Sequence, residues 1–249
     1  MLKSYVSLDL ETTGLNPRLD RIIEIGALKV ENGEIADTFC TFVNPGRGLE
    51  ERITDLTGIE DKDVEGAPYI EEILPDLFQF LSDLPLLGHS VLFDFSFLKK
   101  AAVDLKIPFE KNAVDTLKIA RKYLTALERR SLDYLCDYYK IPHRAHRALE
   151  DARATHVLYG KLAEDFYEKE SGEAAQGQGK RNLFEAAPLQ FQIKRDTPVT
   201  KAQKEQLYRL IEQHKIVLNA DVERLTRSEA SRLIDKIKSG QLVPSDGGE

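Results

Sequence analysis

Three β-strand patterns in succession, joined by short connections, constrain the fold of this 249-residue chain more than any other feature. Residues Tyr5–Leu10, Arg21–Val30 and Glu34–Val43 are rich in apolar residues or alternate apolar with polar ones. Asn32-Gly33, between the second and third patterns, is a strong signal for a tight hairpin. A two-residue hairpin joins antiparallel strands. The chain is therefore predicted to open with an antiparallel sheet.

The next hundred residues alternate helical patterns with short strands. Apolar residues recur at helical spacing from Ile70 to Leu81. An antiparallel opening followed by such alternation predicts an α/β fold, a mixed sheet flanked by helices. Further helices are predicted at Phe95–Leu105, Thr116–Leu124, Ser131–Tyr139 and Arg147–Glu168, and short strands at Leu86–Gly88 and Ala113–Asp115.

The last third of the chain differs in composition from the rest. The stretch from Ser171 to Asn182 contains no large apolar residue, which is typical of a flexible linker. Two amphipathic helices with capping-box starts follow, after Thr200 and Thr226. The predicted organisation is a first domain at residues 1–170, a flexible linker at 171–194 and a small helical module at 195–249.

The charge of the chain is uneven. Lysine and arginine number 35 against 42 acidic residues, a net charge of -7, which argues against coating nucleic acid through bulk positive charge. Carboxylates can still hold divalent cations that meet phosphates. Residues 195–238 carry ten basic and seven acidic side chains. That local excess fits a DNA- or partner-binding module, although a solvated helix face explains it almost as well.

Cysteine content and hydropathy bear on the compartment. Cys40 and Cys136 are too few to form a disulfide framework, and both are predicted to be small core residues. The first residues lack an apolar segment of signal-peptide length, because Asp9 and Glu11 interrupt it. No run of apolar residues approaches the length of a membrane span. A cytoplasmic location without membrane association is therefore expected.

The first chemical signal is a pair of acids at the end of the first strand. Asp9 and Glu11 are two residues apart, so their side chains point to the same face. Neighbouring carboxylates repel, and divalent cations usually relieve the repulsion. Oxygen-only ligands favour Mg²⁺ or Mn²⁺. The alternative is a solvated strand end that happens to carry two acids.

Two further signals accompany predicted helix starts. Asp94 lies among aromatic residues where a helix begins, and could serve as a ligand or as an ordinary cap. Asp151 lies in the first turns of a later helix, with His146 on the preceding loop. A histidine close to a helix-borne acid suits a general base beside a metal ligand. A surface histidine and a solvated acid are the alternative, and His143 nearby is given no role.

In this order and spacing, the three signals resemble the motifs of DEDDh 3′–5′ exonucleases, above all the proofreading (epsilon) subunit of bacterial DNA polymerase III and its stand-alone relatives. The resemblance covers about Tyr5 to Phe166 and implies a ribonuclease H-like sheet. The second motif begins at Gly88-His89-Ser90 and includes Asp94, and Ser90 departs from the pattern, since the family often has Asn after this histidine. The matching stretches are Asp9-x-Glu11-Thr12-Thr13-Gly14, His146-x-Ala148-x-x-Asp151, Ile22-Ile23-Glu24-Ile25-Gly26-Ala27, Leu56-Thr57-Gly58-Ile59 and Asp115-Thr116.

The resemblance implies a two-metal-ion hydrolase of DNA. Two divalent ions, Mg²⁺ or Mn²⁺, would be held by Asp9, Glu11, Asp94 and Asp151, and His146 would take a proton from the attacking water. The reaction would release 5′-mononucleotides from the 3′ end during replication proofreading or DNA repair.

Substrate contacts are also implied by the resemblance. Thr12 and Thr13 would lie near the 3′-hydroxyl, Leu15 would wedge against the terminal base, and Phe93 would stack on the next one. Leu15 and Phe93 could instead be packing residues. Arg144 and Arg147 are weaker candidates for phosphate contacts.

The expected partner is DNA with a free 3′ end, and an RNA-trimming enzyme is the alternative within the class. A DNA polymerase is a candidate protein partner. A sliding clamp is a second candidate, because residues 180–184, Lys-Arg-Asn-Leu-Phe, form a degenerate version of a clamp-binding motif. An adaptor that has lost the chemistry would lack an acid or the histidine, and all five positions are filled.

Overall fold

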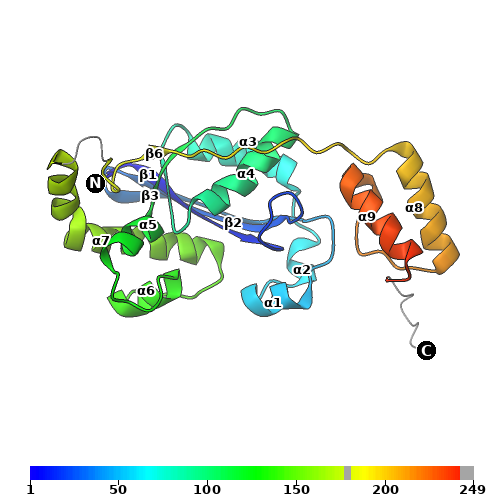
Figure 1. The fold of residues 1–249 in the computed structure, drawn as a ribbon, viewed down its shortest axis with the longest axis horizontal. Helices are drawn as coiled ribbons and strands as arrows, with labels where there is room; N and C mark the ends of the chain where they lie inside the picture. The colour runs from blue at the N-terminus through cyan, green and yellow to red at the C-terminus, as the bar shows by residue number, and fades with distance from the viewer. Residues whose placement is uncertain (177–180, 242–249) are drawn as a thin grey trace.

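A computed structural model describes residues 1–176 and 181–241 of the chain, and its centre is a mixed β-sheet. Among these residues, six strands lie in the order β3-β2-β1-β4-β5-β6 (Figure 1). The three N-terminal strands are antiparallel, β4 and β5 run parallel to β1, and β6 is antiparallel to β5. The predicted α/β class is therefore confirmed. The strands are β1 (Tyr5–Thr12), β2 (Ile22–Glu31), β3 (Glu34–Phe42), β4 (Leu86–Gly88), β5 (Asn112–Asp115) and β6 (Ala187–Pro188).

Helices cover both faces of the sheet. One face packs against α3 (Ile70–Leu81) and α4 (Leu92–Asp104) in a core that includes Leu8, Leu74 and Phe95. The other face packs against α5 (Thr116–Tyr123), α6 (Leu132–Tyr139) and α7 (Ala148–Gln176) in a core that includes Leu28 and Leu158. Two short helices, α1 (Glu51–Thr57) and α2 (Asp61–Val64), also belong to this part of the chain.

The predicted linker, residues 171–194, is largely docked on the first domain instead of free. Helix α7 continues through it to Gln176. Phe184 is fully buried in the second core beside Tyr159 and Tyr167, and the short strand β6 then extends the sheet. The anchor consists of two apolar residues, Leu183 and Phe184. Two residues barely change the polar composition of the segment, so the composition does not predict the docking.

This burial also bears on the clamp-binding motif. Lys180, its first residue, lies outside the described residues. Phe184 packs against the domain's own aromatic rings, and its carbonyl oxygen accepts a hydrogen bond from the Tyr159 hydroxyl (3.1 Å). Binding a partner through this ring would require undocking it from the core. The structure therefore argues against residues 180–184 as a clamp-binding motif.

The C-terminal helices form a small core of their own. Helices α8 (Lys201–His214) and α9 (Arg227–Lys238) pack through residues that include Leu207, Ala230 and Ile234, with the 3₁₀ turn Val222–Arg224 beneath them. Both predicted capping boxes are present. Figure 1 shows the pair at the end of the molecule near α1 and α2, reached by a long segment that runs back from β6. We refer to residues 200–238 as the C-terminal module.

Two smaller expectations have different outcomes. Cys136 is buried as predicted, whereas Cys40 is exposed, because β3 is an edge strand with little cover. Among the described residues, none of the helices has the length and apolar character needed to cross a membrane.

Candidate active site

Strand β1 delivers two carboxylates to one face of the sheet. Leu8 and Leu10 point into the core beneath α3 and α4, so Asp9 and Glu11, which alternate with them, point to the opposite face. On the neighbouring strand β2, Glu24 lies opposite Glu11. The predicted same-face placement of Asp9 and Glu11 therefore agrees with the structure.

Helix α4 adds a third carboxylate. Asp94 lies in its first turn, is only 3% exposed, and accepts a hydrogen bond from the backbone N–H of Leu10 (3.1 Å). That bond ties the helix start directly to the strand that carries Asp9. The pKa of Asp9 is raised well above its ordinary range, first by burial and then by Asp94 and Asp151. Burial likewise raises the pKa of Asp94.

Helix α7 completes the cluster. Ligand atoms of Glu11, His146 and Asp151 all lie within 4.8 Å of one another. Burial, followed by the charges of Asp151 and Glu24, raises the pKa of Glu11 to about 8. A bound cation would offset the mutual repulsion of such carboxylates, so these are the residues that could hold one.

The start of α7 is fixed by β2, through two residues of the Ile22–Ala27 stretch. The buried carboxylate of Glu24 accepts hydrogen bonds from the Arg147 guanidinium (2.9 Å) and from the backbone N–H of Ala148 (3.1 Å). At Gly26, an added Cβ would lie 2.1 Å from the carbonyl carbon of Ala148. The helix therefore approaches the strand as closely as only glycine allows. Arg147 has a structural partner here, and this differs from the phosphate contact considered for it.

His146 and His143 both contact Asp151, in different ways. His146 has a positive φ of 63°, and its backbone N–H donates to Asp151 Oδ2 (3.1 Å). The His143 ring bonds through Nε2 to Asp151 Oδ1, and its Nδ1 lies 3.3 Å from Asp133. The His143 ring is also nearly buried. Sequence reasoning missed this contact, because a loop residue eight positions before the acid carries no periodic signal.

Residues at the start of the second motif, His89 and Ser90, hold one corner of the site together through hydrogen bonds. The His89 ring bridges the Thr116 hydroxyl (2.9 Å) and the Arg130 carbonyl (2.7 Å), and burial lowers its pKa. The backbone N–H of Ser90 donates to Asp115 (3.0 Å). These bonds join the end of β4 to the end of β5, and α4 with Asp94 starts from this corner.

The four predicted substrate residues differ in availability. The Thr12 hydroxyl donates to the Gly14 carbonyl (2.7 Å), and the Thr13 hydroxyl accepts from the Arg47 guanidinium (2.6 Å), so both are engaged within the protein. Leu15 is 84% exposed. Phe93 is partly buried against the first core and Phe97. Leu15 is thus the freest of the four to meet a ligand.

The family profile described as exonuclease matches residues 6–159, more than half of the chain. The chain belongs to the exonuclease family. It is a DEDDh-type 3′–5′ exonuclease domain, as the sequence motifs predict.

Its relatives include large bacterial polymerases. The DNA polymerase III PolC-type of Caldanaerobacter subterraneus subsp. tengcongensis is 43% identical over 166 residues, covering 66% of this chain and 12% of that protein. The protein of the same name from Oceanobacillus iheyensis is 34% identical over 256 residues, covering 99% of this chain and 17% of that protein. The exonuclease chain therefore spans less than a fifth of these relatives. The longer match includes the C-terminal module.

Solved structures share the exonuclease fold. Exonuclease I has a TM-score of 0.61 at 17% identity, covering 69% of this chain and 44% of that one. Exonuclease X in complex with 5′ overhanging duplex DNA has a TM-score of 0.53 at 23% identity, covering 66% of this chain and 93% of that one. At these identities the likeness shows the fold alone.

Proposed function

We propose that this exonuclease is a metal-dependent enzyme that removes 5′-mononucleotides from the 3′ end of DNA. The observation that carries the proposal is the gathering of Asp9, Glu11, Asp94 and Asp151 from three separate elements, β1, α4 and α7, around one buried point. Such a cluster is costly to bury without cations.

The donor set fits hard divalent cations. Asp9, Glu11, Asp94 and Asp151 would hold two ions, and carboxylate oxygen donors select Mg²⁺ or Mn²⁺ over softer metals. When bound, these ions would offset the charge of the cluster and stabilise the negative charge that develops on the phosphodiester oxygens.

The chain's own residues supply the proton transfer and the positioning. A ring nitrogen of His146 accepts a proton from the water that attacks the terminal phosphodiester. The bond between phosphorus and the 3′-oxygen breaks, and the phosphate leaves on the released nucleotide. The new 3′-oxygen of the shortened strand takes a proton from solvent, to which His146 returns the proton that it accepted. Asp151 positions the His146 loop through the backbone hydrogen bond described above. Glu24 holds the helix on which Asp151 lies.

Four residues would contact the strand end. Leu15 wedges against the terminal base and Phe93 stacks on the next, while the backbone around Thr12 and Thr13 lies along the terminal sugar. DNA is favoured as the substrate because the two relatives described above are named as DNA polymerases. For the same reason, we favour replication proofreading with a polymerase partner as the biological role, ahead of stand-alone DNA repair.

The deciding experiment is a cleavage time course on a 5′-labelled single-stranded DNA and its RNA equivalent, each with Mg²⁺, with Mn²⁺ and with EDTA. A metal-dependent ladder that shortens from the 3′ end supports the proposal, and the faster strand identifies the substrate. Faster cleavage of RNA would overturn the DNA assignment. Cleavage that persists in EDTA would overturn the metal assignment.

A further inference from the structure

The loop that joins β1 to β2, residues 13–21, is closed at its neck and open at its tip. At the neck, the backbone N–H of Thr13 donates to the Arg21 carbonyl (2.8 Å), and the N–H of Arg21 donates to the Thr13 hydroxyl (2.9 Å). At the tip, Leu15 is 84% exposed. The neck begins at Thr13, two residues after Glu11. A movement of the loop would therefore shift the backbone next to the carboxylate cluster. We call residues 13–21 the Leu15 loop.

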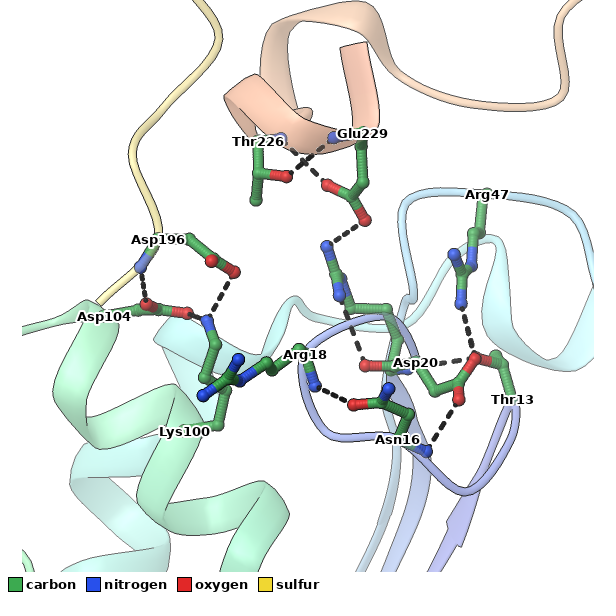
Figure 2. Close-up of polar contacts among 11 residues, drawn as sticks. Thr13, Asn16, Arg18, Asp20, Arg47, Lys100, Asp104, Asp196, Thr226 and Glu229 are labelled. Atoms are coloured by element: carbon green, nitrogen blue, oxygen red, sulfur yellow. Dashed lines mark hydrogen bonds and ion pairs between the residues drawn. The ribbon is translucent and has the colours of Figure 1, made fainter. Parts of the chain in front are cut away.

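The Leu15 loop is compact enough to move as one body. The Asp20 carboxylate accepts the backbone N–H of Asn16 (2.9 Å), and the Asn16 side chain accepts the N–H of Arg18 (3.0 Å; Figure 2). An added Cβ on Gly14 would lie 2.5 Å from the same Asp20 carboxylate. The position of Leu15 therefore depends on the contacts that hold Thr13 and Arg21, the two residues of the neck, in place.

Helix α9 of the C-terminal module holds the neck on one side. The Arg21 guanidinium pairs with Glu229 Oε1 (2.6 Å), and Glu229 Oε2 accepts the backbone N–H of Thr226 (2.8 Å). The carboxylate is thus fixed at both oxygens. The Arg21 and Glu229 side chains are 28% and 11% exposed, so this charge-assisted bond is better shielded from solvent than an ordinary surface pair.

The same module holds the other side of the neck through Arg47. The Arg47 guanidinium donates to the Thr13 hydroxyl (2.6 Å), as Figure 2 shows. The loop that carries Arg47 is paired in turn with the module, where the N–H of Gly48 donates to the Asn219 carbonyl (2.9 Å). Both supports of the Leu15 loop therefore depend on where the C-terminal module lies.

We infer that Arg21 and Glu229 are positioning residues, through which the C-terminal module sets the placement of the Leu15 loop against the 3′-terminal nucleotide. This inference rests on the proposed function. It gives the module a task within the active site that differs from the expected DNA- or partner-binding role. Because neither residue touches the carboxylate cluster, loosening the pair weakens the hold on the strand end and leaves the chemical step intact.

The test variant is Glu229→Gln in the full chain. Glutamine can still complete the capping box, so α9 keeps its start while the charge partner of Arg21 is lost. We expect the KM for a 5′-labelled single-stranded DNA to rise about threefold to tenfold, with kcat within about twofold of wild type. Hydrogen exchange at the amides of residues 14–20 should accelerate.

A double-mutant cycle and a matched control make the test specific. Arg21→Gln should behave like Glu229→Gln, and the double variant should be no worse than either single one. The control is Lys201→Gln in the same module. The Lys201 side chain is 92% exposed and pairs with Glu205 only at 3.9 Å, so KM and hydrogen exchange should stay as in wild type. Unchanged KM and exchange in Glu229→Gln, a fall in kcat alone, or additive single effects would each overturn the inference. If the wild type cleaves neither DNA nor RNA, the proposed function fails. The hydrogen-exchange measurement alone then decides whether the Arg21–Glu229 pair holds the Leu15 loop.

Discussion

Gly26 of β2 lies directly beneath Ala148 of α7, and the backbone of the helix occupies the space where a Cβ would be. This contact decides how far the helix-borne Asp151 stands from the strand-borne Glu11. The sequence pattern predicts the strand and the helix separately. Neither pattern specifies how closely the two elements pack.

Substituting Gly26 by alanine should displace the start of α7. The added methyl group would meet backbone atoms that cannot rotate away, and overpacking of this kind costs about 1–3 kcal/mol of unfolding free energy. Cleavage should fall as well, because Asp151 moves with the helix. Gly160→Ala is the matched control, since an added Cβ at that helical position would meet nothing within 4 Å apart from its chain neighbours and the backbone of its own helix. Chemical denaturation should show Gly160→Ala equal to or more stable than wild type.

Stability without metal should depend on pH through Glu11. Its pKa is about 8 in the folded protein against an ordinary 4.5, so the folded state binds more protons between these values. The contribution of Glu11 to the free energy of unfolding is therefore largest below pH 4.5 and declines as the pH rises toward 8. In EDTA, the melting temperature should decrease across that window. Added Mg²⁺ should raise it more at pH 8 than at pH 5, and an equal rise at both would contradict the prediction.

Asp94→Asn should separate stability from activity. The amide oxygen can still accept the Leu10 N–H, whereas the buried charge is gone. Cleavage should be lost, and the melting temperature in EDTA at pH 8 should rise, because burial raises the pKa of the native carboxyl. Asp94→Ala, which also removes the acceptor, should melt lower than Asp94→Asn. Cleavage by Asp94→Asn within tenfold of wild type would exclude Asp94 from the metal site.

The two histidines should have distinguishable effects. His146→Ala should lower kcat by roughly 10²–10⁴-fold while metal affinity stays measurable, as expected for a general base. His143→Ala should instead weaken Mn²⁺ affinity by about tenfold or more, because its ring orients the Asp151 carboxylate. Isothermal titration with Mn²⁺, read beside the cleavage rates, checks both. If His143→Ala binds Mn²⁺ like wild type, its contact with Asp151 is only structural.

Local patterns predicted the parts of the site that depend on period and spacing. The alternation of β1 places Asp9 and Glu11 on one face, and the helix starts place Asp94 and Asp151 in first turns. The sheet, and the helices that cover it, follow from the same periodicities.

Features that depend on distant segments could not be predicted in this way. The docking of Phe184 depends on contacts with the rings of Tyr159 and Tyr167, and no composition rule reveals them. The Arg21–Glu229 pair joins residues 208 positions apart. Both residues look like ordinary surface charges in the sequence, and only the closed fold brings them together.

The segment that leads to the C-terminal module is fastened a second time before the module begins. Asp196 pairs with Lys100 of α4 (2.7 Å), and the backbone N–H of Asp196 donates to Asp104 (3.0 Å). From this anchor, four residues lead to Thr200, a reach of at most roughly 14 Å. If α9 releases Arg21, the module therefore remains tethered beside its binding surface at a high effective concentration. Re-forming the Arg21–Glu229 pair would then need only a local movement of the module, so the anchor at Asp196 also serves to restore the support of the Leu15 loop.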